Sequence, residues 1–346
     1  MARTDTLTHY LTDIADAIRE KTGSSDPIQA SSFDTAIENL PSGGGYPPDW
    51  SEIGYPSTPD YVMDAFDYAK EIYDNWDSSR TSMVYLYNGD KSLKFIPLVD
   101  TSNVTNMMGA FRECTRLIYV PLLDTSNVTT MATMFYYCSN IKTIPLLDTS
   151  KVTDMGNMLT GCYNLLTIPQ FDTSNVTNMS SMLINCSKLT AIPQFNTNKV
   201  TNMNNMFSSC ENITTIPQFN TSNVTNMSVM FSNCPKLISV PLLDAGSVLN
   251  IMNIFSSCRA LENLGGFKDL GKAYLTSRAQ NYSDYTLNLS ACNSLTHESL
   301  MNVINNLYDI KTKGCKNQKL QLGSTNLAKL TAEEIAIATN KGWNVV

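Results

Sequence analysis

A period of 24 residues runs through the middle of the chain and restricts its fold more than any other feature. Several columns of like residues share this interval. The proline column is Pro97, Pro121, Pro145, Pro169, Pro193, Pro217 and Pro241. The cysteine column is Cys114, Cys138, Cys162, Cys186, Cys210, Cys234 and Cys258. Valine, methionine and Phe/Leu columns keep the same register, so residues 24 positions apart occupy equivalent places in copies of one structural unit.

Each unit carries a fixed pattern of apolar and turn-forming residues. In residues 114–138 the Leu-x-x-Val and Val-x-x-Met segments predict two short walls that turn their apolar side chains inward. The spacing of Met134, Phe135 and Cys138 predicts one helical turn. Residues 121–127, Pro-Leu-Leu-Asp-Thr-Ser-Asn, predict a corner, because Pro lacks an N–H and Asp, Ser and Asn favour turns.

One unit alone has too few apolar side chains to offset the entropy lost on ordering its 24 residues. Neighbouring units must therefore bury one another's faces and pair their backbones. The sequence predicts an α/β solenoid, a leucine-rich-repeat-like stack of coils with helical N- and C-terminal caps.

The period divides the chain into four parts. Residues 1–45 are expected to form a small helical attachment segment with a Gly/Pro linker, and residues 46–96 an N-terminal cap, with a helix over 59–75, and a degenerate repeat. Residues 97–264 are the seven repeats, and residues 265–346 are irregular repeats and a C-terminal cap.

Elements of the C-terminal cap can be placed by pattern. We expect a wall at Leu287, Leu289, Cys292 and Leu295, then a helix with Leu300, Val303, Ile304 and Leu307 on one face. A last strand is expected at Leu320-x-Leu322, and a capping box at residues 331–334 predicts a final helix that ends before Gly342.

The attachment segment carries one apolar stripe at helical spacing, formed by Leu7, Leu11, Ile14 and Ile18. The segment is too small for an independent core, so this stripe is expected to bind a partner or to self-associate. A helical hairpin folded against the repeats remains the alternative.

The repeat sequence itself, Asp-Thr-Ser-Asn-Val-Thr-Asn-Met followed by Met-Phe, Cys and an Ile-Pro segment, resembles the BspA-like leucine-rich repeats of bacterial surface proteins and phage-encoded proteins over residues 80–264. That resemblance implies a right-handed coil, short parallel strands and adhesion to a ligand or surface. Residues 1–45, with Ile-Ala-Asp-Ala-Ile-Arg-Glu-Lys-Thr-Gly, are similar to N-terminal segments of phage tail and fibre proteins, which implies attachment to a virion.

Other classes of function are disfavoured. The net charge is −7, and residues 1–90 hold 16 acidic against 5 basic side chains, without a cationic cluster for nucleic acid. No apolar run is long enough for membrane insertion, and no export signal is recognised at the N-terminus. A phage protein made in the host cytoplasm and carried on the virion is therefore expected, extracellular after release.

The cysteine column invites a metal or redox interpretation, but only two histidines are present, so a buried, reduced ladder is favoured. The column Asp100, Asp124, Asp148, Asp172 could hold calcium, yet a structural turn explains it better. No catalytic set is recognised. We expect no enzyme activity, no cofactor and no metal.

The expected function is a non-enzymatic structural or adhesion protein of a phage, of the tail-fibre, receptor-binding or decoration type. It would contact other virion proteins through residues 1–45 and a host surface protein or glycan elsewhere, and it could form homo-oligomers. The alternative is a bacterial cell-surface adhesin or interaction scaffold. The most variable positions flank each cysteine, at Arg112/Glu113, Tyr136/Tyr137 and Tyr163/Asn164. If one edge is selective, it should lie there.

Overall fold

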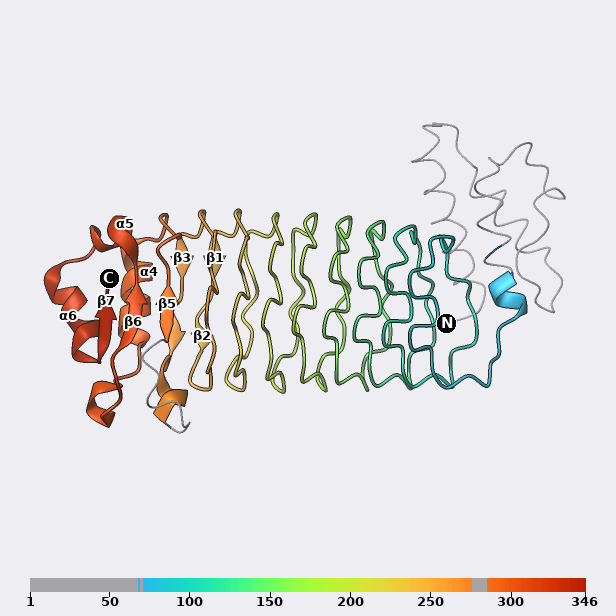
Figure 1. The fold of residues 1–346 in the computed structure, drawn as a ribbon, viewed down its shortest axis with the longest axis horizontal. Coiled ribbons are helices and arrows are strands. Elements are labelled where there is room, and N and C mark those ends of the chain that lie inside the picture. Colours follow the sequence, from blue (N-terminus) through green and yellow to red (C-terminus); the bar gives the residue numbers. More distant parts are fainter. Residues whose placement is uncertain (1–67, 69–70, 276–284) are drawn as a thin grey trace, which may run out of the picture.

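The computed structural model describes residues 68, 71–275 and 285–346. Its central part is a row of coils that follow one another along one long axis, from the blue-green N-terminal coil to the orange-red C-terminal cap (Figure 1). Each coil advances by one 24-residue unit. The predicted repeat protein is thus confirmed, with few helices and with small parallel sheets.

Regular strands are short and gather toward the C-terminal end. Two parallel pairs are β1 (Ser239–Val240) with β3 (Asn263–Leu264) and β2 (Leu243–Asp244) with β4 (Phe267–Lys268). A three-stranded parallel sheet has the order β5 (Thr286–Asn288), β6 (Gln318–Gln321), β7 (Trp343–Val345). The other coils are joined by single parallel bridges one unit apart, such as Asn106 to Thr130.

Where a helical turn is predicted in each unit, the structure has consecutive β-turns instead. The N–H of Cys138 donates to the oxygen of Phe135 over 3.0 Å, but Thr133 and Tyr137 have φ of 56° and 55°. A helical turn needs successive negative φ values, so that prediction is wrong. With these positive φ values, every second N–H of the segment points toward the next coil. The N–H of Phe135, for example, donates to the oxygen of Met158 in the next coil over 2.9 Å.

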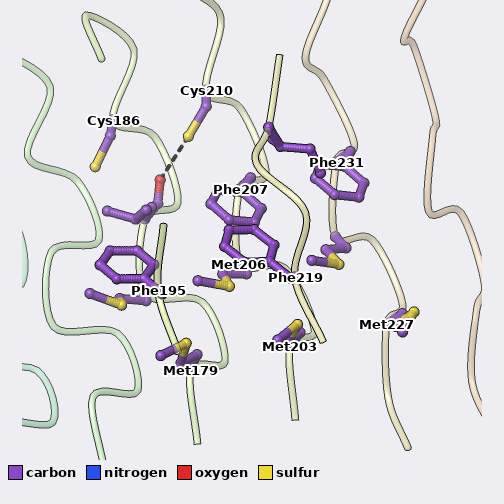
Figure 2. Close-up of a cluster of buried hydrophobic side chains, with 14 of the residues drawn as sticks. Met179, Cys186, Phe195, Met203, Met206, Phe207, Cys210, Phe219, Met227 and Phe231 are labelled. Atoms are coloured by element: carbon purple, nitrogen blue, oxygen red, sulfur yellow. Dashed lines mark hydrogen bonds between the residues drawn. The ribbon is translucent and has the colours of Figure 1, made fainter. Parts of the chain in front are cut away.

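Two columns of bulky side chains share the space inside each coil. The inner column is Phe111, Phe135, Leu159, Leu183, Phe207, Phe231 and Phe255, and all are fully buried. The corner column, 12 positions further on, is Leu123, Leu147, Phe171, Phe195, Phe219, Leu243 and Phe267. Phe207 stacks on Phe219 at 6.0 Å between ring centroids and on Phe231 at 5.5 Å (Figure 2). Every coil has a phenylalanine in at least one of the two columns.

The cysteine column is buried, as predicted. Each thiol points toward a main-chain oxygen of the preceding coil, and Cys210 Sγ lies 3.1 Å from the oxygen of Leu183 (Figure 2). Burial raises the pKa of the Cys162 thiol to about 12, so it stays protonated at neutral pH. The column therefore acts as small apolar packing with a weak hydrogen bond.

At the C-terminal end, helices cover the last coils. α4 (His297–Asn306) is capped by the Thr296 hydroxyl, and α6 (Ala332–Asn340) begins with the predicted capping box of Thr331 and Glu334. The predicted wall from Leu287 to Leu295 is buried. The segment Leu320-x-Leu322 is not the last strand, however, because β6 is followed by α5 (Gly323–Leu327), α6 and β7. The 3-10 helices are Lys272–Leu275 and Lys311–Lys313.

The predicted N-terminal helix over 59–75 lies mostly outside the described residues. Within that range residues 68 and 71–74 are described as helical. The Trp76 indole donates to the oxygen of Asp100 over 2.7 Å, and the Arg80 guanidinium lies 5.6 Å from the centre of its ring. Met83 and Leu93 of the degenerate repeat are buried. Ile72, Tyr73 and Trp76 are partly buried and pack against the core of the repeats at this end.

Candidate functional site

The positions that flank each cysteine line one edge of the stack. In the last three coils the two positions before the cysteine hold small polar residues, and the position after it holds Glu211, Pro235 or Arg259. The small polar residues are Ser208, Ser209, Ser232, Asn233, Ser256 and Ser257. In the coils nearer the N-terminus the same positions carry large side chains. These are Arg112, Glu113, Tyr136, Tyr137 and Tyr163, here named the tyrosine edge.

The side chains of the tyrosine edge contact one another across three successive coils. The Arg112 guanidinium lies 4.9 Å from the centre of the Tyr136 ring and 2.6 Å from the Glu113 carboxylate. The Tyr136 and Tyr137 rings are 4.7 Å apart and tilted, and Tyr137 meets Tyr163 edge-on at 6.0 Å. The five residues therefore form one continuous group.

Tyr137 owes its position to a glycine in the next coil. A Cβ on Gly161 would lie 2.9 Å from Cγ of the Tyr137 ring, which is too close for any other residue. Gly161 also has φ of +74°, a conformation that glycine adopts readily. The ring of Tyr137 thus rests directly on the backbone of the neighbouring coil and has little freedom to rotate.

Tyr163 is the most open ring of the group, with 38% of its surface exposed. Partial burial raises the pKa of Tyr163, and its hydrogen bond with Tyr137 raises it further. Its phenol is therefore protonated at neutral pH, and this proton is used in the hydrogen bond with Tyr137. The tyrosine edge combines an exposed aromatic face with a hydroxyl oxygen that can accept a hydrogen bond.

Two further basic residues, Lys91 and Arg116, belong to the coils of this edge. Lys91 Nζ donates to the main-chain oxygen of Glu113 over 2.9 Å. Arg116 is exposed and has no hydrogen-bond or ion-pair partner among the residues that the structure describes. The neighbouring Asp90 carboxylate accepts the Tyr68 hydroxyl at 2.6 Å and the N–H of Ser92, so it faces its own loop.

Five of the six residues named for a selective edge contact one another as the tyrosine edge, and the selectivity itself stays a prediction. The sixth, Asn164, uses its amide to bond the oxygen of Ser139 at 2.8 Å. The predicted partner-binding residues Leu7, Leu11, Ile14 and Ile18 lie outside the described residues. Variation beside each cysteine indicated the edge from the sequence. The contact between Tyr137 and Gly161 joins residues of two coils and is known only from the structure.

The other candidate chemistry takes structural roles. The Asp148 carboxylate accepts the N–H of Ser150 at 2.9 Å, and hydrogen bonds from Ser150 hold the pKa of Asp148 below its usual range. Asp100, Asp124 and Asp172 accept in the same way from the residue two positions on. Within the described ranges, no group of three His, Cys, Asp or Glu side chains is arranged to hold a metal ion. None of the helices described there is long and apolar enough to cross a membrane.

A second exposed surface was not predicted. Leu98, Leu122 and Leu146 form a leucine row with 39%, 45% and 60% of their surfaces exposed. In the next coils glutamine replaces leucine, and the Gln170 amide donates to the oxygen of Gln194 over 2.6 Å. The change from Leu to Gln in the position after each proline is the sequence signal that could have revealed it.

Comparison with known protein families agrees with the repeat. Residues 60–167, 120–191 and 162–267 match the model of a family described as Mycoplasma protein of unknown function, DUF285. The comparison with curated proteins gives no match. The three overlapping segments run together from residue 60 to residue 267, well over half of the chain, and they agree with a repeat protein of the BspA-like group. On this evidence the chain belongs to the DUF285 family.

Proposed function

We propose that the chain is a non-enzymatic binding protein that presents the tyrosine edge on a leucine-rich-repeat-like α/β solenoid. The observation that carries this proposal is the concentration of three tyrosines and an arginine on an edge that elsewhere holds mostly small polar residues. Tyrosine and arginine are the residues most often enriched where binding energy concentrates, because they offer large contact area and several hydrogen bonds.

The construction of the edge supports the same conclusion. Tyr137 is fixed on Gly161, and the Tyr136 ring lies under the Arg112 guanidinium. Side chains that are already held in place lose little conformational entropy when a partner binds. The coils below them serve as a rigid support.

We further propose that the protein is a virion-associated structural or adhesion protein of a phage. In this proposal residues 1–45 attach to other virion proteins, through the stripe of Leu7, Leu11, Ile14 and Ile18, and the repeats face outward. The support is the similarity of residues 1–45 to segments of phage tail and fibre proteins. The protein would be made in the host cytoplasm and be extracellular after release, and it could form homo-oligomers.

The second candidate is a bacterial cell-surface adhesin or interaction scaffold of the BspA-like type. The observation in its favour is the family match, since the description of that family names a cellular bacterium, Mycoplasma. Both candidates use the same binding edge. They differ in whether a virion or a bacterial cell surface carries that edge.

Two measurements test these proposals. Quantitative proteomics of purified particles and of cell envelopes decides between the carriers: a constant number of copies per particle supports the virion, and presence in envelopes alone supports the adhesin. Binding of the labelled full chain to host cells tests the edge. We expect the variant Tyr163→Ser, which introduces the residue found one coil away at Ser139 and Ser187, to bind host cells at least tenfold more weakly. Unchanged cell binding would remove the edge from the proposal.

A further inference from the structure

We propose that the tyrosine edge binds a chain of acidic sugars, an oligosaccharide of hexuronic acids laid along the stack axis. This inference rests on the proposed binding function and specifies its ligand. Four features support it: backbone N–H groups that are already hydrogen-bonded, rings held in place, the local charge and the spacing of the coils.

The backbone of the edge is already used. The Tyr137 N–H donates to the oxygen of Thr160 in the next coil at 2.6 Å, and the Ser139 N–H donates to the oxygen of Tyr137 at 2.9 Å. The N–H groups of Glu113 and Thr115 are bonded in the same way. A peptide that adds as a strand needs free N–H and C=O groups, so recognition here must come from side chains.

The rings favour a sugar among ligands recognised by side chains. A pyranose presents a face of C–H groups that packs on an aromatic ring, with hydroxyls around its rim. Tyr163 offers an exposed ring with a hydroxyl at its rim, and the Arg112 guanidinium lies at the other end of the group, over the Tyr136 ring. The nearly perpendicular setting of Tyr137 against Tyr163 keeps the latter ring from collapsing onto its neighbour.

The charge favours an acidic sugar over a neutral one. Lys91, Arg112 and Arg116 bring three positive charges to the edge, and Glu113 and the neighbouring Asp90 supply two negative charges. The carboxylate of Glu113 is held by Arg112, so Lys91 and Arg116 remain without a carboxylate of their own among the described residues. An arginine guanidinium matches a carboxylate with two parallel hydrogen bonds. This positive edge stands out on a chain with a net charge of −7.

The spacing of the coils fits a polymer. Successive coils are joined by parallel backbone pairing, which sets neighbouring chains about 4.8 Å apart. One hexose in a polysaccharide has nearly this length. A chain of uronic acids that runs along the stack would therefore bring one sugar to each coil, over the three coils that carry the tyrosine edge.

The test uses the full chain and two defined probes, fluorescently labelled hexamers of oligogalacturonate and of oligomannuronate, measured by anisotropy at two salt concentrations. We expect at least one acidic hexamer to bind, with affinity that falls as salt rises. Tyr163→Ser and Arg112→Gln should each weaken binding at least tenfold. The matched control is Asn233→Ser. Asn233 occupies the position equivalent to Tyr137 four coils further along the chain, and this variant should bind as the parent does.

Three results would overturn the inference: no binding of either acidic hexamer, equal binding of the neutral hexamer cellohexaose, or equal binding of a poly-glutamate peptide of matched charge. Circular dichroism and the melting temperature of each variant show whether it is folded, and the serine of Tyr163→Ser already occurs at this position in neighbouring coils. If host-cell binding depends on Tyr163 and neither hexamer binds, the proposed function stands and the sugar assignment falls.

Discussion

The inner and corner columns predict that, inside one coil, a larger side chain in one column can compensate for a smaller side chain in the other. Leu159 of the inner column is followed by Phe171 of the corner column, whereas one coil earlier Phe135 is followed by Leu147. All four side chains have 1% or less of their surface exposed. In the coil of Phe207 these two positions are in direct ring contact, so the two columns share one volume.

The perturbation is Phe171→Leu, which leaves two leucines in that coil, a pairing that none of the seven coils has. Loss of a buried ring and the cavity left behind should lower the free energy of unfolding by about 1–2 kcal/mol. Leu159→Phe alone adds a ring to a filled coil and should cost about 1 kcal/mol or more. The double variant recreates the pairing of Phe135 with Leu147 and should cost less than about 1 kcal/mol.

The assay is urea denaturation of the full chain, followed by circular dichroism, for the parent, both single variants and the double variant. Compensation appears as a coupling energy of about 1–2 kcal/mol between the two sites. The control Phe219→Leu leaves a pairing found in three other coils and should cost less than Phe171→Leu. Additive effects, with a coupling energy below about 0.5 kcal/mol, would refute the shared volume.

Five further predictions follow from buried and strained positions. Met155→Asp, which places a carboxylate at a fully buried position, should lower the free energy of unfolding by more than about 3 kcal/mol in urea denaturation, and Met155→Leu should nearly preserve it. Thr149→Val removes a hydroxyl that donates to a main-chain oxygen of the next coil at 2.8 Å and should cost about 1–2 kcal/mol by the same assay. Because the folded pKa of Cys162, about 12, lies above its ordinary value of 9.0, the stability due to its protonated thiol is complete below about pH 9 and is lost as the pH rises toward 12; melting temperatures measured from pH 8 to 11 check this loss. At pH 8 a thiol reagent should modify half-buried Cys315 long before Cys162, which mass spectrometry of the folded chain would show. Val229→Asn should stabilise the fold, for the reason argued last.

The repeat and the inward columns could be predicted because each rests on a pattern that recurs in register. Cys162, Met155 and Val152 are fully buried, as their columns require. The turn segment could not be predicted in the same way. Apolar residues three and four positions apart are typical of a helical turn, but the consecutive β-turns of residues 131–138 place the same side chains inward. Side-chain spacing alone does not distinguish the two, and the difference arises from backbone bonds between coils.

For the tyrosine edge, the sequence predicted the positions of the residues but not the contacts between them. Variation at the positions beside each cysteine indicated where the coils differ on their outer side. The group itself depends on residues one coil apart, such as Tyr137 on Gly161 and Arg112 over Tyr136, and these contacts follow from the register of the stack. The leucine row escaped prediction for the opposite reason. Its members follow a proline in each unit, and leucine in that position suggests burial, although Leu146 is 60% exposed.

The left-handed positions of the coils show where sequence and backbone disagree. Val229 has φ of 60°, which costs a β-branched residue roughly 1–2 kcal/mol, whereas Asn157, Asn205 and Asn253 hold the equivalent positions in other coils and suit this conformation better. Val229→Asn should therefore raise the free energy of unfolding by about 1 kcal/mol in urea denaturation, since the half-buried valine loses little packing. A loss of stability would mean that the coils impose no strain there. Tyr137 has φ of 55°, and the stack tolerates the same strain at that position, where the ring supports the tyrosine edge.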